Sequence, residues 1–346
     1  SNIIIMIGKI AANDRNTDPV LKLNPPEKVK EKLDYYRSLF GKVQDLSDKE
    51  FENLKKDVHK FFNIFPFKKP NILPNNLVRI TNNNRIFAGQ GKDVSYLTDI
   101  SQLLAPPIEY CKYGRCNQPG EQVLYCAIDL PSAYWETKPQ NGDVITISYF
   151  QLKKGVKINC NFITRVKNTN PKVRNTLEEV YYLIDDFLVD AFSLEVARDR
   201  PRDYIFSADF ASTQQLFYPV PSDKNIEAII YPSVQRKVVG QNMAIRNDII
   251  FDKYDLIGIE TKFILDEFEN PDPASPEPTA DNLIASFGTN QFDFTNGKIL
   301  YHKNVDKVFD LLRMLQTGGS RQQRVPNPMG MKNMIMNLSP NSNIKM

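Results

Sequence analysis

The chain has little net charge, which excludes the partners that a strongly charged protein attracts. Its 44 lysines and arginines against 41 aspartates and glutamates give a formal net charge of +3. Such a balance provides no general basic field to hold nucleic acid by counterion release. We therefore expect no nucleic-acid partner, and any anion must bind at a local site.

Histidines and closely spaced cysteine pairs are also scarce. The two histidines, His59 and His302, lie far apart in the sequence and in no recognisable triad motif. Cys111 and Cys116 have a spacing that slightly resembles a metal-ligand pair, but no second close pair accompanies them. The sequence therefore predicts no metal site, and reduced thiols that fill small apolar spaces in a reducing compartment.

Long hydrophobic runs are absent as well. The apolar residues 3–7 (Ile-Ile-Ile-Met-Ile) are far fewer than the roughly 20 residues that a membrane-spanning helix needs. They also lack a preceding basic region and a small-residue cleavage site. The sequence thus predicts no export signal, no membrane contact and a cytoplasmic location.

The chain does contain enough apolar material for at least one sizeable core, since 41% of its 346 residues are hydrophobic. Residues 26–62 have a helical pattern, and Ser47 and Glu50 have capping-box spacing at the start of a second helix there. The proline- and asparagine-rich residues 65–76 predict an extended linker. We expect a helical hairpin and a linker over residues 1–74, ahead of a different structural unit.

Short apolar runs separated by turns predict strands between residues 77 and 150. Alternation along residues 123–128 places Tyr125 and Cys126 on opposite faces of one such strand, and both faces should be at least partly covered. Another buried strand is predicted at residues 227–231.

The second half of the chain adds an amphipathic helix that begins at Thr176, and the charged residues 198–203 are expected to end it. The tail from residue 317 to 346 has no helical or strand period. Three further elements are predicted: a mobile acidic loop at 267–278, a β-hairpin at 292–301 and a helix at 304–315.

Three separated segments of the chain share the features of a known motif set. The segments are 77–80 (Leu-Val-Arg-Ile); 113–120 (Tyr-Gly-Arg-Cys-Asn-Gln-Pro-Gly) running through 123–127 to 133–136 (Ala-Tyr-Trp-Glu); and 230–234 (Ile-Tyr-Pro-Ser-Val) followed by 240–244 (Gly-Gln-Asn-Met-Ala). In their order, their residue types and the spacing within the second segment, they resemble the RES domain over roughly residues 75–255. This is a family of NAD-degrading toxins and NAD phosphorylases that is named for an arginine, a glutamate and a serine.

The resemblance implies a fold and an activity. The implied fold is α+β, with a mixed, twisted β-sheet core like that of ADP-ribosyltransferases, flanking helices and the N-terminal helical hairpin. The RES-like catalytic domain would cover residues 75–316, with an inserted helix at about 175–198, before a disordered tail at 317–346. The implied activity is cleavage of the nicotinamide–ribose bond of NAD by water or inorganic phosphate, without a further cofactor, in a toxin or defence effector.

The chemistry of this reaction calls for residues that the segments contain. Breaking the bond develops oxocarbenium character on the ribose, so the site needs a carboxylate near the anomeric carbon and donors for the pyrophosphate. Glu136, Arg79 and Arg115 provide these groups, and a guanidinium matches phosphate oxygens better than an ammonium does. The resemblance makes Glu136, Arg79 and Ser233 the catalytic candidates.

Further candidates bind the substrate. Tyr125 could stack its ring on nicotinamide or touch the ribose with its hydroxyl, or it could be ordinary core. Ser233 is expected to act as a hydrogen-bonding ligand rather than a nucleophile, because no histidine forms a triad with it; its plain alternative is a serine that closes a turn. The substrate-binding candidates are Arg115, Tyr125, Asn117 and Asn242, with Arg85 in addition.

Other functions stay open at this point. The same carboxylate and arginines would serve an ADP-ribosyltransferase that modifies a protein acceptor. A catalytically inactive module whose N-terminal helices dock a partner is the alternative outside enzymes. The partners left open are a protein antitoxin or another regulatory protein, and a second copy of the chain in a homodimer.

Overall fold

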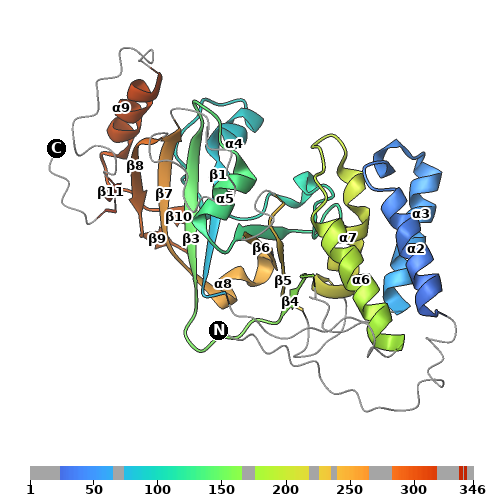
Figure 1. Cartoon of the computed structure of the whole chain (residues 1–346). Coiled ribbons are helices and arrows are strands. Elements are labelled where there is room, and N and C mark those ends of the chain that lie inside the picture. The colour runs from blue at the N-terminus through green and yellow to red at the C-terminus, as the bar shows by residue number, and fades with distance from the viewer. Residues whose placement is uncertain are drawn as a thin grey trace.

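The structure is a computed structural model of the chain, and one large β-sheet lies at its centre with helices at its sides (Figure 1). It describes residues 24–64, 74–165, 176–217, 226–234, 240–264, 283–317, 335–337 and 339–340. The apolar residues 3–7, most of the predicted linker (65–73) and the predicted acidic loop (267–278) lie outside the described residues.

Within the described residues the sheet has nine strands in the order β11-β8-β7-β3-β1-β2-β6-β5-β4. Most neighbours are antiparallel, whereas β11 with β8 and β4 with β5 are parallel. The α+β class, with a mixed sheet, flanking helices and N-terminal helices, is confirmed. The strands are β1 (Asn76–Asn82), β2 (Val123–Ala127), β3 (Val144–Leu152), β4 (Cys160–Phe162), β5 (Ala228–Pro232), β6 (Gln241–Arg246), β7 (Tyr254–Ile264), β8 (Leu283–Thr289) and β11 (Ile335–Asn337).

Pairing is continuous on one side of β1 and nearly absent on the other. All seven residues of β1 pair with β3, from Asn76 opposite Gln151 to Asn82 opposite Ile145. On the other side, β1 and β2 share a single registered pair, Val78 opposite Ala127. The two strands therefore diverge, and the sheet opens between them.

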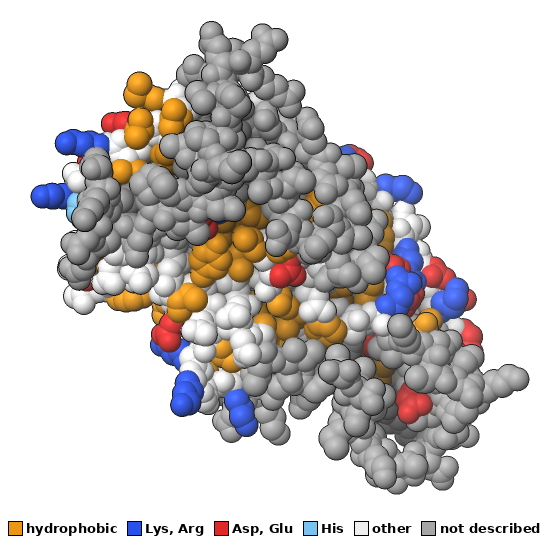
Figure 2. All heavy atoms as spheres, turned by 60° about the vertical axis from the view of Figure 1, so that its left-hand side comes forward, with side chains coloured by type: hydrophobic (Ala, Val, Ile, Leu, Met, Phe, Trp, Pro, Cys, Tyr) orange, Lys and Arg blue, Asp and Glu red, His pale blue; other side chains and the backbone are white. Residues whose placement is uncertain are grey.

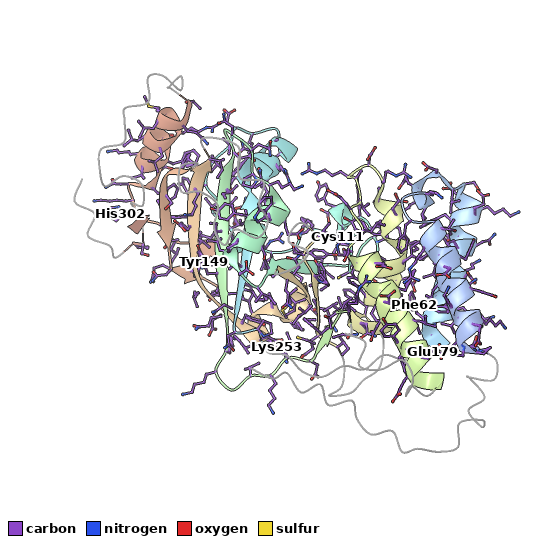
Figure 3. The ribbon with its side chains drawn as sticks, viewed as in Figure 1. Phe62, Cys111, Tyr149, Glu179, Lys253 and His302 are labelled. Carbon is purple, nitrogen blue, oxygen red and sulfur yellow. The ribbon has the colours of Figure 1, made fainter. Side chains whose placement is uncertain are left out.

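The N-terminal helices share one hydrophobic cluster with two later helices. The predicted capping box is present, since Ser47 N donates to Glu50 Oε2 at 2.9 Å and Glu50 N donates to Ser47 Oγ at 3.4 Å. In Figure 1 the four helices stand together at one end of the sheet, and in Figure 3 Phe62 lies within this group. The helices are α2 (Pro26–Ser38), α3 (Asp48–Ile64), α6 (Thr176–Phe192) and α7 (Ile205–Ala211), which join the residues of β2, β5 and β6 in that cluster.

The N-terminal apolar side chains are deeply buried in this cluster, because the hairpin faces α6 and α7 rather than solvent. The side chains of Leu33, Tyr36 and Val58 are completely buried, and Phe62 is 1% exposed. Such burial is typical of a core element. The boundary drawn at residue 74 between the helical region and the catalytic domain stays a prediction.

Helix α6 ends at Phe192, before the charged residues 198–203 that were expected to end it. The guanidinium of Arg115 binds the carbonyl oxygens of Phe192 and Leu194 at this end. Helix C-termini expose unsatisfied carbonyl groups that a cation can bind. The carbonyl groups at the end of α6 are therefore bound by a residue that is distant in the sequence. No local sequence pattern indicates this contact.

The face of the sheet around the opening carries a short helix, α5 (Leu130–Thr137), which contacts both β1 and β2. As alternation predicted, Tyr125 and Cys126 belong to different hydrophobic clusters on the two sides of β2. Helix α4 (Asn83–Gly89) follows β1 directly. Helix α5 therefore lies across the opening. Helix α4 begins where β1 ends.

The C-terminal part confirms the predicted hairpin and helix. Strands β9 (Phe292–Asp293) and β10 (Lys298–Ile299) form the hairpin, and α9 (Val305–Thr317) follows. Within the predicted tail, β11 pairs in parallel with β8. Residues 318–334 lie outside the described residues, and the disordered tail stays a prediction.

The surface carries charges of both signs beside hydrophobic side chains, and the cysteines form no disulfides. Basic and acidic side chains stand close together on the face drawn in Figure 2, where hydrophobic side chains also gather near the centre. All four cysteines are buried and free of disulfides. No helix among the described residues combines the length and the apolar character needed to cross a membrane.

Candidate functional site

The opening between β1 and β2 holds a cavity of about 340 Å³. Small-molecule sites typically measure about 300–1,000 Å³. The two strand edges contribute to its wall, as do α5, β5, β6 and the loops that contain Arg115 and Tyr204. Of the eight residues predicted for the site, the cavity lining includes Arg79, Arg115, Tyr125, Glu136 and Asn242.

Glu136 lies in the last turn of α5, a helix whose start and end are both defined by local hydrogen bonding and backbone geometry. Asp129 caps the helix by accepting a hydrogen bond from Ser132 N at 2.7 Å. The helix stops directly after Glu136 and Thr137, because Lys138 has a left-handed backbone with φ of 45°. A non-glycine residue in this conformation is strained, and such strain is common at functional sites.

Two donors hold one oxygen of the Glu136 carboxylate. Ser233 Oγ donates to Glu136 Oε1 at 2.5 Å, and Asn242 Nδ2 donates to the same oxygen at 2.9 Å. Both donors are buried, Ser233 to 1% exposure and Asn242 to 5%, whereas Glu136 itself is exposed. The arrangement orients the carboxylate through Oε1 at the cavity that Glu136 lines, and within the described part of the chain no hydrogen bond engages Oε2.

Ser233 contacts the site through Glu136. Ser233 itself does not line the cavity. It directly follows β5, whose residue Tyr231 is part of the lining. The expected ligand role therefore takes the form of a positioning contact: the hydroxyl touches the carboxylate rather than the space that a substrate would fill. Asn242 combines both positions, since it binds Glu136 and also lines the cavity.

Arg79 bridges the opening. Its Nη1 donates to the carbonyl of Tyr125 at 2.9 Å, and its Nη2 donates to the carbonyl of Leu104 at 3.1 Å. Its Nε is buried without a hydrogen-bond partner. Burial lowers the pKa of Arg79, because desolvation opposes its charge. A buried guanidinium bound only to neutral carbonyls favours a nearby anion.

Arg115 forms the opposite part of the wall. Besides the carbonyls of Phe192 and Leu194, its guanidinium lies 5.2 Å from the ring centre of Tyr204 and 5.9 Å from that of Tyr231. Among the described residues it has no carboxylate partner, so its charge is uncompensated like that of Arg79. Two hydrogen bonds leave further N–H groups of each five-donor guanidinium for a ligand.

Asn117, in the turn that follows Gly114, is hydrogen-bonded to Tyr125 on β2. The Tyr125 hydroxyl donates to Asn117 Oδ1 at 2.7 Å and accepts from Cys116 N at 2.8 Å. The Asn117 amide also donates to two backbone carbonyls, and Asn117 is not part of the cavity lining. The Tyr125 hydroxyl is therefore engaged within the protein, and Asn117 supports Tyr125 where a direct substrate contact was expected.

Gly114 explains why this turn needs a residue without a side chain. A Cβ atom at Gly114 would lie 2.4 Å from Asn117 Oδ1 and 2.8 Å from the Tyr125 hydroxyl oxygen. Contacts this short do not occur, so any side chain would displace the hydrogen bond between Asn117 and Tyr125.

Sequence reasoning missed several residues of the wall. Tyr231 lies within the third resembling segment but was not singled out, and Tyr204 and Thr137 carry no local signal. Burial raises the pKa values of Tyr125 and Tyr231 well above their ordinary value, so both phenols stay neutral. Arg85 is exposed on α4 and does not line the cavity.

Thiol, histidine and metal chemistry are not evident at this site. Burial raises the pKa of Cys126, a lining residue, to about 12, which leaves its thiol protonated and unreactive. His302 lies at the far side of the sheet from Cys111 in Figure 3, and neither histidine lines the cavity. No group of three or more metal-binding side chains occurs in the described part of the chain.

The arrangement combines one oriented carboxylate, two arginines without carboxylate partners and two neutral phenols around a small-molecule cavity. It can stabilise positive charge at Glu136 and bind negative charge at the arginines. Comparison with protein-family models, curated proteins and solved structures finds no match to this chain. The function must therefore be argued from these side chains.

Proposed function

We propose that the chain cleaves the nicotinamide–ribose bond of NAD, with water or inorganic phosphate as acceptor. The observation that carries the proposal is the Glu136 carboxylate, held through one oxygen by Ser233 and Asn242 at a cavity with two uncompensated arginines. This pairing of an anion with cations corresponds to the charges of the substrate. NAD carries positive charge at its nicotinamide end and negative charge on its pyrophosphate.

Glu136 would act where positive charge develops. As the bond from the ribose anomeric carbon to the ring nitrogen breaks, its electron pair neutralises the nicotinamide, and the ribose gains oxocarbenium character. A fixed carboxylate stabilises this transition state more than the ground state, which raises the rate. The acceptor oxygen then bonds to the anomeric carbon, and Glu136 can take the proton that water loses.

Arg79 and Arg115 would act on the anionic part of the substrate. Each is held by backbone carbonyls, so its guanidinium is oriented before any ligand arrives, and its charge awaits a counter-ion. The same cations would attract inorganic phosphate, which is why the proposal includes both acceptors. The resemblance to the RES family agrees with this chemistry and adds the expectation of a toxin or defence effector.

The test is incubation of the purified chain with NAD, with and without inorganic phosphate, followed by mass analysis of the products. Nicotinamide with ADP-ribose indicates hydrolysis, whereas nicotinamide with phosphorylated ADP-ribose indicates phosphorolysis. An ADP-ribose mass added to a protein in a bacterial extract would instead favour the transferase. Intact NAD under all these conditions, with folded protein, would overturn the proposal.

A further inference from the structure

Residues 200–203, which lead directly into the cavity wall, are tied to the N-terminal helical region by ion pairs. Arg200 binds both carboxylate oxygens of Asp45, through Nη1 at 2.9 Å and Nη2 at 2.7 Å. Arg202 Nη2 donates to Asp48 Oδ1 at 2.6 Å. The partner carboxylates are exposed, so these pairs by themselves contribute little stability, but they fix an orientation.

A partly buried set of hydrogen bonds around Asp203 joins the same two segments. Gln44 N donates to Asp203 Oδ1 at 2.9 Å, and Arg202 N donates to Gln44 Oε1 at 3.0 Å. Asp203 is 3% exposed, and it also accepts from Arg200 Nε at 2.9 Å. A buried carboxylate with two partners, Gln44 N and Arg200 Nε, cannot shift without leaving polar groups unpaired, so the segment is held in place.

Phe51, near the start of α3, contacts both segments that lead to the part of the cavity wall formed by Tyr204 and Arg115. It is 5% exposed. The Arg202 guanidinium lies 4.7 Å from its ring centre, and the Tyr113 ring meets it edge-on at 5.9 Å. One side chain of the N-terminal region therefore packs against both the segment before Tyr204 and the turn that contains Gly114.

Both segments that contact Phe51 lead to residues that line the cavity. Tyr204 follows the docked segment, lines the cavity and lies under the Arg115 guanidinium at 5.2 Å. Tyr113 immediately precedes Gly114 and Arg115, which are also lining residues. The position of Arg115 relative to Glu136 thus depends on two contacts that meet at Phe51.

We propose that the start of α3 is a positioning element of the active site, in which Phe51, together with Asp45 and Asp48, sets the Tyr204–Arg115 wall against Glu136. The N-terminal helical region is then part of the working site rather than an accessory module. The consequence for catalysis rests on the proposed function, whereas the positioning of the wall does not.

The experiment compares Phe51→Leu with Phe61→Leu. Both phenylalanines are buried on α3, but Phe61 packs on Tyr36 and Phe62 instead of Arg202 and Tyr113. A second pair needs no core change: Asp45→Asn/Asp48→Asn against Asp186→Asn/Asp190→Asn. The control pair removes two carboxylates of α6 that bind Arg37 of α2 rather than Arg200 and Arg202.

Two readouts separate the inference from the proposed function. Amide hydrogen exchange of peptides covering residues 113–116 and 203–205 reports the wall itself, without a ligand. NAD binding is followed by the fluorescence of Trp135, the single tryptophan, which adjoins Glu136, and kcat/KM is measured alongside. Thermal melting of every variant shows whether it folds.

We expect faster exchange at both peptides and weaker NAD binding in Phe51→Leu and, to a smaller degree, in Asp45→Asn/Asp48→Asn. A displacement of about 1 Å can lower an enzymatic rate on the order of 10²-fold, so kcat/KM should fall by about tenfold or more in Phe51→Leu. The controls should melt at similarly lowered temperatures with unchanged exchange at the wall. Unchanged exchange in the Phe51 and Asp45/Asp48 variants would overturn the positioning role. An unaltered chain that leaves NAD intact would instead overturn the proposed function, while exchange still decides the positioning.

Discussion

The two sides of the sheet opening are built by different means. On the β1 side, the strand is held by continuous pairing with β3, which itself pairs with β7 along its length. On the β2 side, β2, β6 and β5 are backed by the hydrophobic cluster of α2, α3, α6 and α7. Backbone pairing is continuous within both sides, and the β2 side is in addition backed by the packing of four helices.

The two sides contribute different side chains to the site. Arg79 comes from the paired strand, while Ser233, Asn242 and Arg115 come from the packed side. Glu136, on the helix that crosses the opening, depends on both. Disturbing the packed side should therefore alter the site more easily than disturbing the paired side, and the following predictions test this comparison.

Deletion of residues 1–70 should have the largest effect, because it removes half of the helical packing. Fully burying one Leu, Val or Phe side chain contributes about 1.5–3 kcal/mol, and Val29, Leu33, Val58 and Phe62 are at most 2% exposed. Their summed loss approaches a typical folding stability of about 5–15 kcal/mol. We expect insoluble protein or a non-cooperative melt by circular dichroism. A sharp cooperative transition would show that the helical region is a separate module.

Glu136→Gln should lower turnover by about 10²-fold or more, because it removes the charge that the transition state needs. NAD binding should stay within about tenfold, since Gln keeps the size of the side chain and can still accept hydrogen bonds. The measurement is kcat and Trp135 fluorescence titration on the same preparation. Turnover equal to that of the unaltered chain would remove Glu136 from the catalytic assignment.

Arg79→Lys tests the bond across the opening. One charge remains, but the planar fork that reaches both Tyr125 O and Leu104 O is lost. Hydrogen bonds to charged groups contribute about 1.5–3 kcal/mol, so NAD affinity and turnover should fall together by about tenfold or more. The matched control is Arg85→Lys, at an exposed position of α4 outside the cavity lining, which should change neither. Full NAD affinity in Arg79→Lys would exclude Arg79 from the binding site.

Asp209→Asn should give the smallest effect, a change in pH dependence on the packed side. Burial raises the pKa of Asp209 to about 6, partly offset by His59, whose Nδ1 lies 3.5 Å from Asp209 Oδ1. The unfolded value is about 3.9, so the folded state holds the proton more tightly. Its stabilising contribution is present below about pH 4 and is lost as the pH rises through about 6.

The Asn variant cannot titrate at this position. Its melting temperature should therefore fall less between pH 4 and 7 than that of the unaltered chain, and above pH 7 the variant should be at least as stable. Parallel melting curves across this range would show that Asp209 does not titrate in it. The comparison needs only circular dichroism in matched buffers.

Local patterns sufficed for much of the fold. The capping box of Ser47 and Glu50, the alternation through Tyr125 and the turn before β10 are each set by neighbours in the chain, and each was predicted. Local patterns did not indicate contacts between distant segments: Arg115 binds the carbonyl groups at the end of α6, and β11 pairs with β8. Such contacts leave no periodicity to read.

For the site, the sequence by itself determined which chemical groups are available: a carboxylate at Glu136, guanidinium groups at Arg79 and Arg115, and amide and hydroxyl donors at Asn242 and Ser233. The tertiary structure alone decided how they are used. It directed Ser233 to Glu136, set Asn117 behind Tyr125 and brought Tyr204 into the wall. The physical reason is that hydrogen-bond partners are selected by distance and direction in space, which depend on how the sheet opens and what packs behind it.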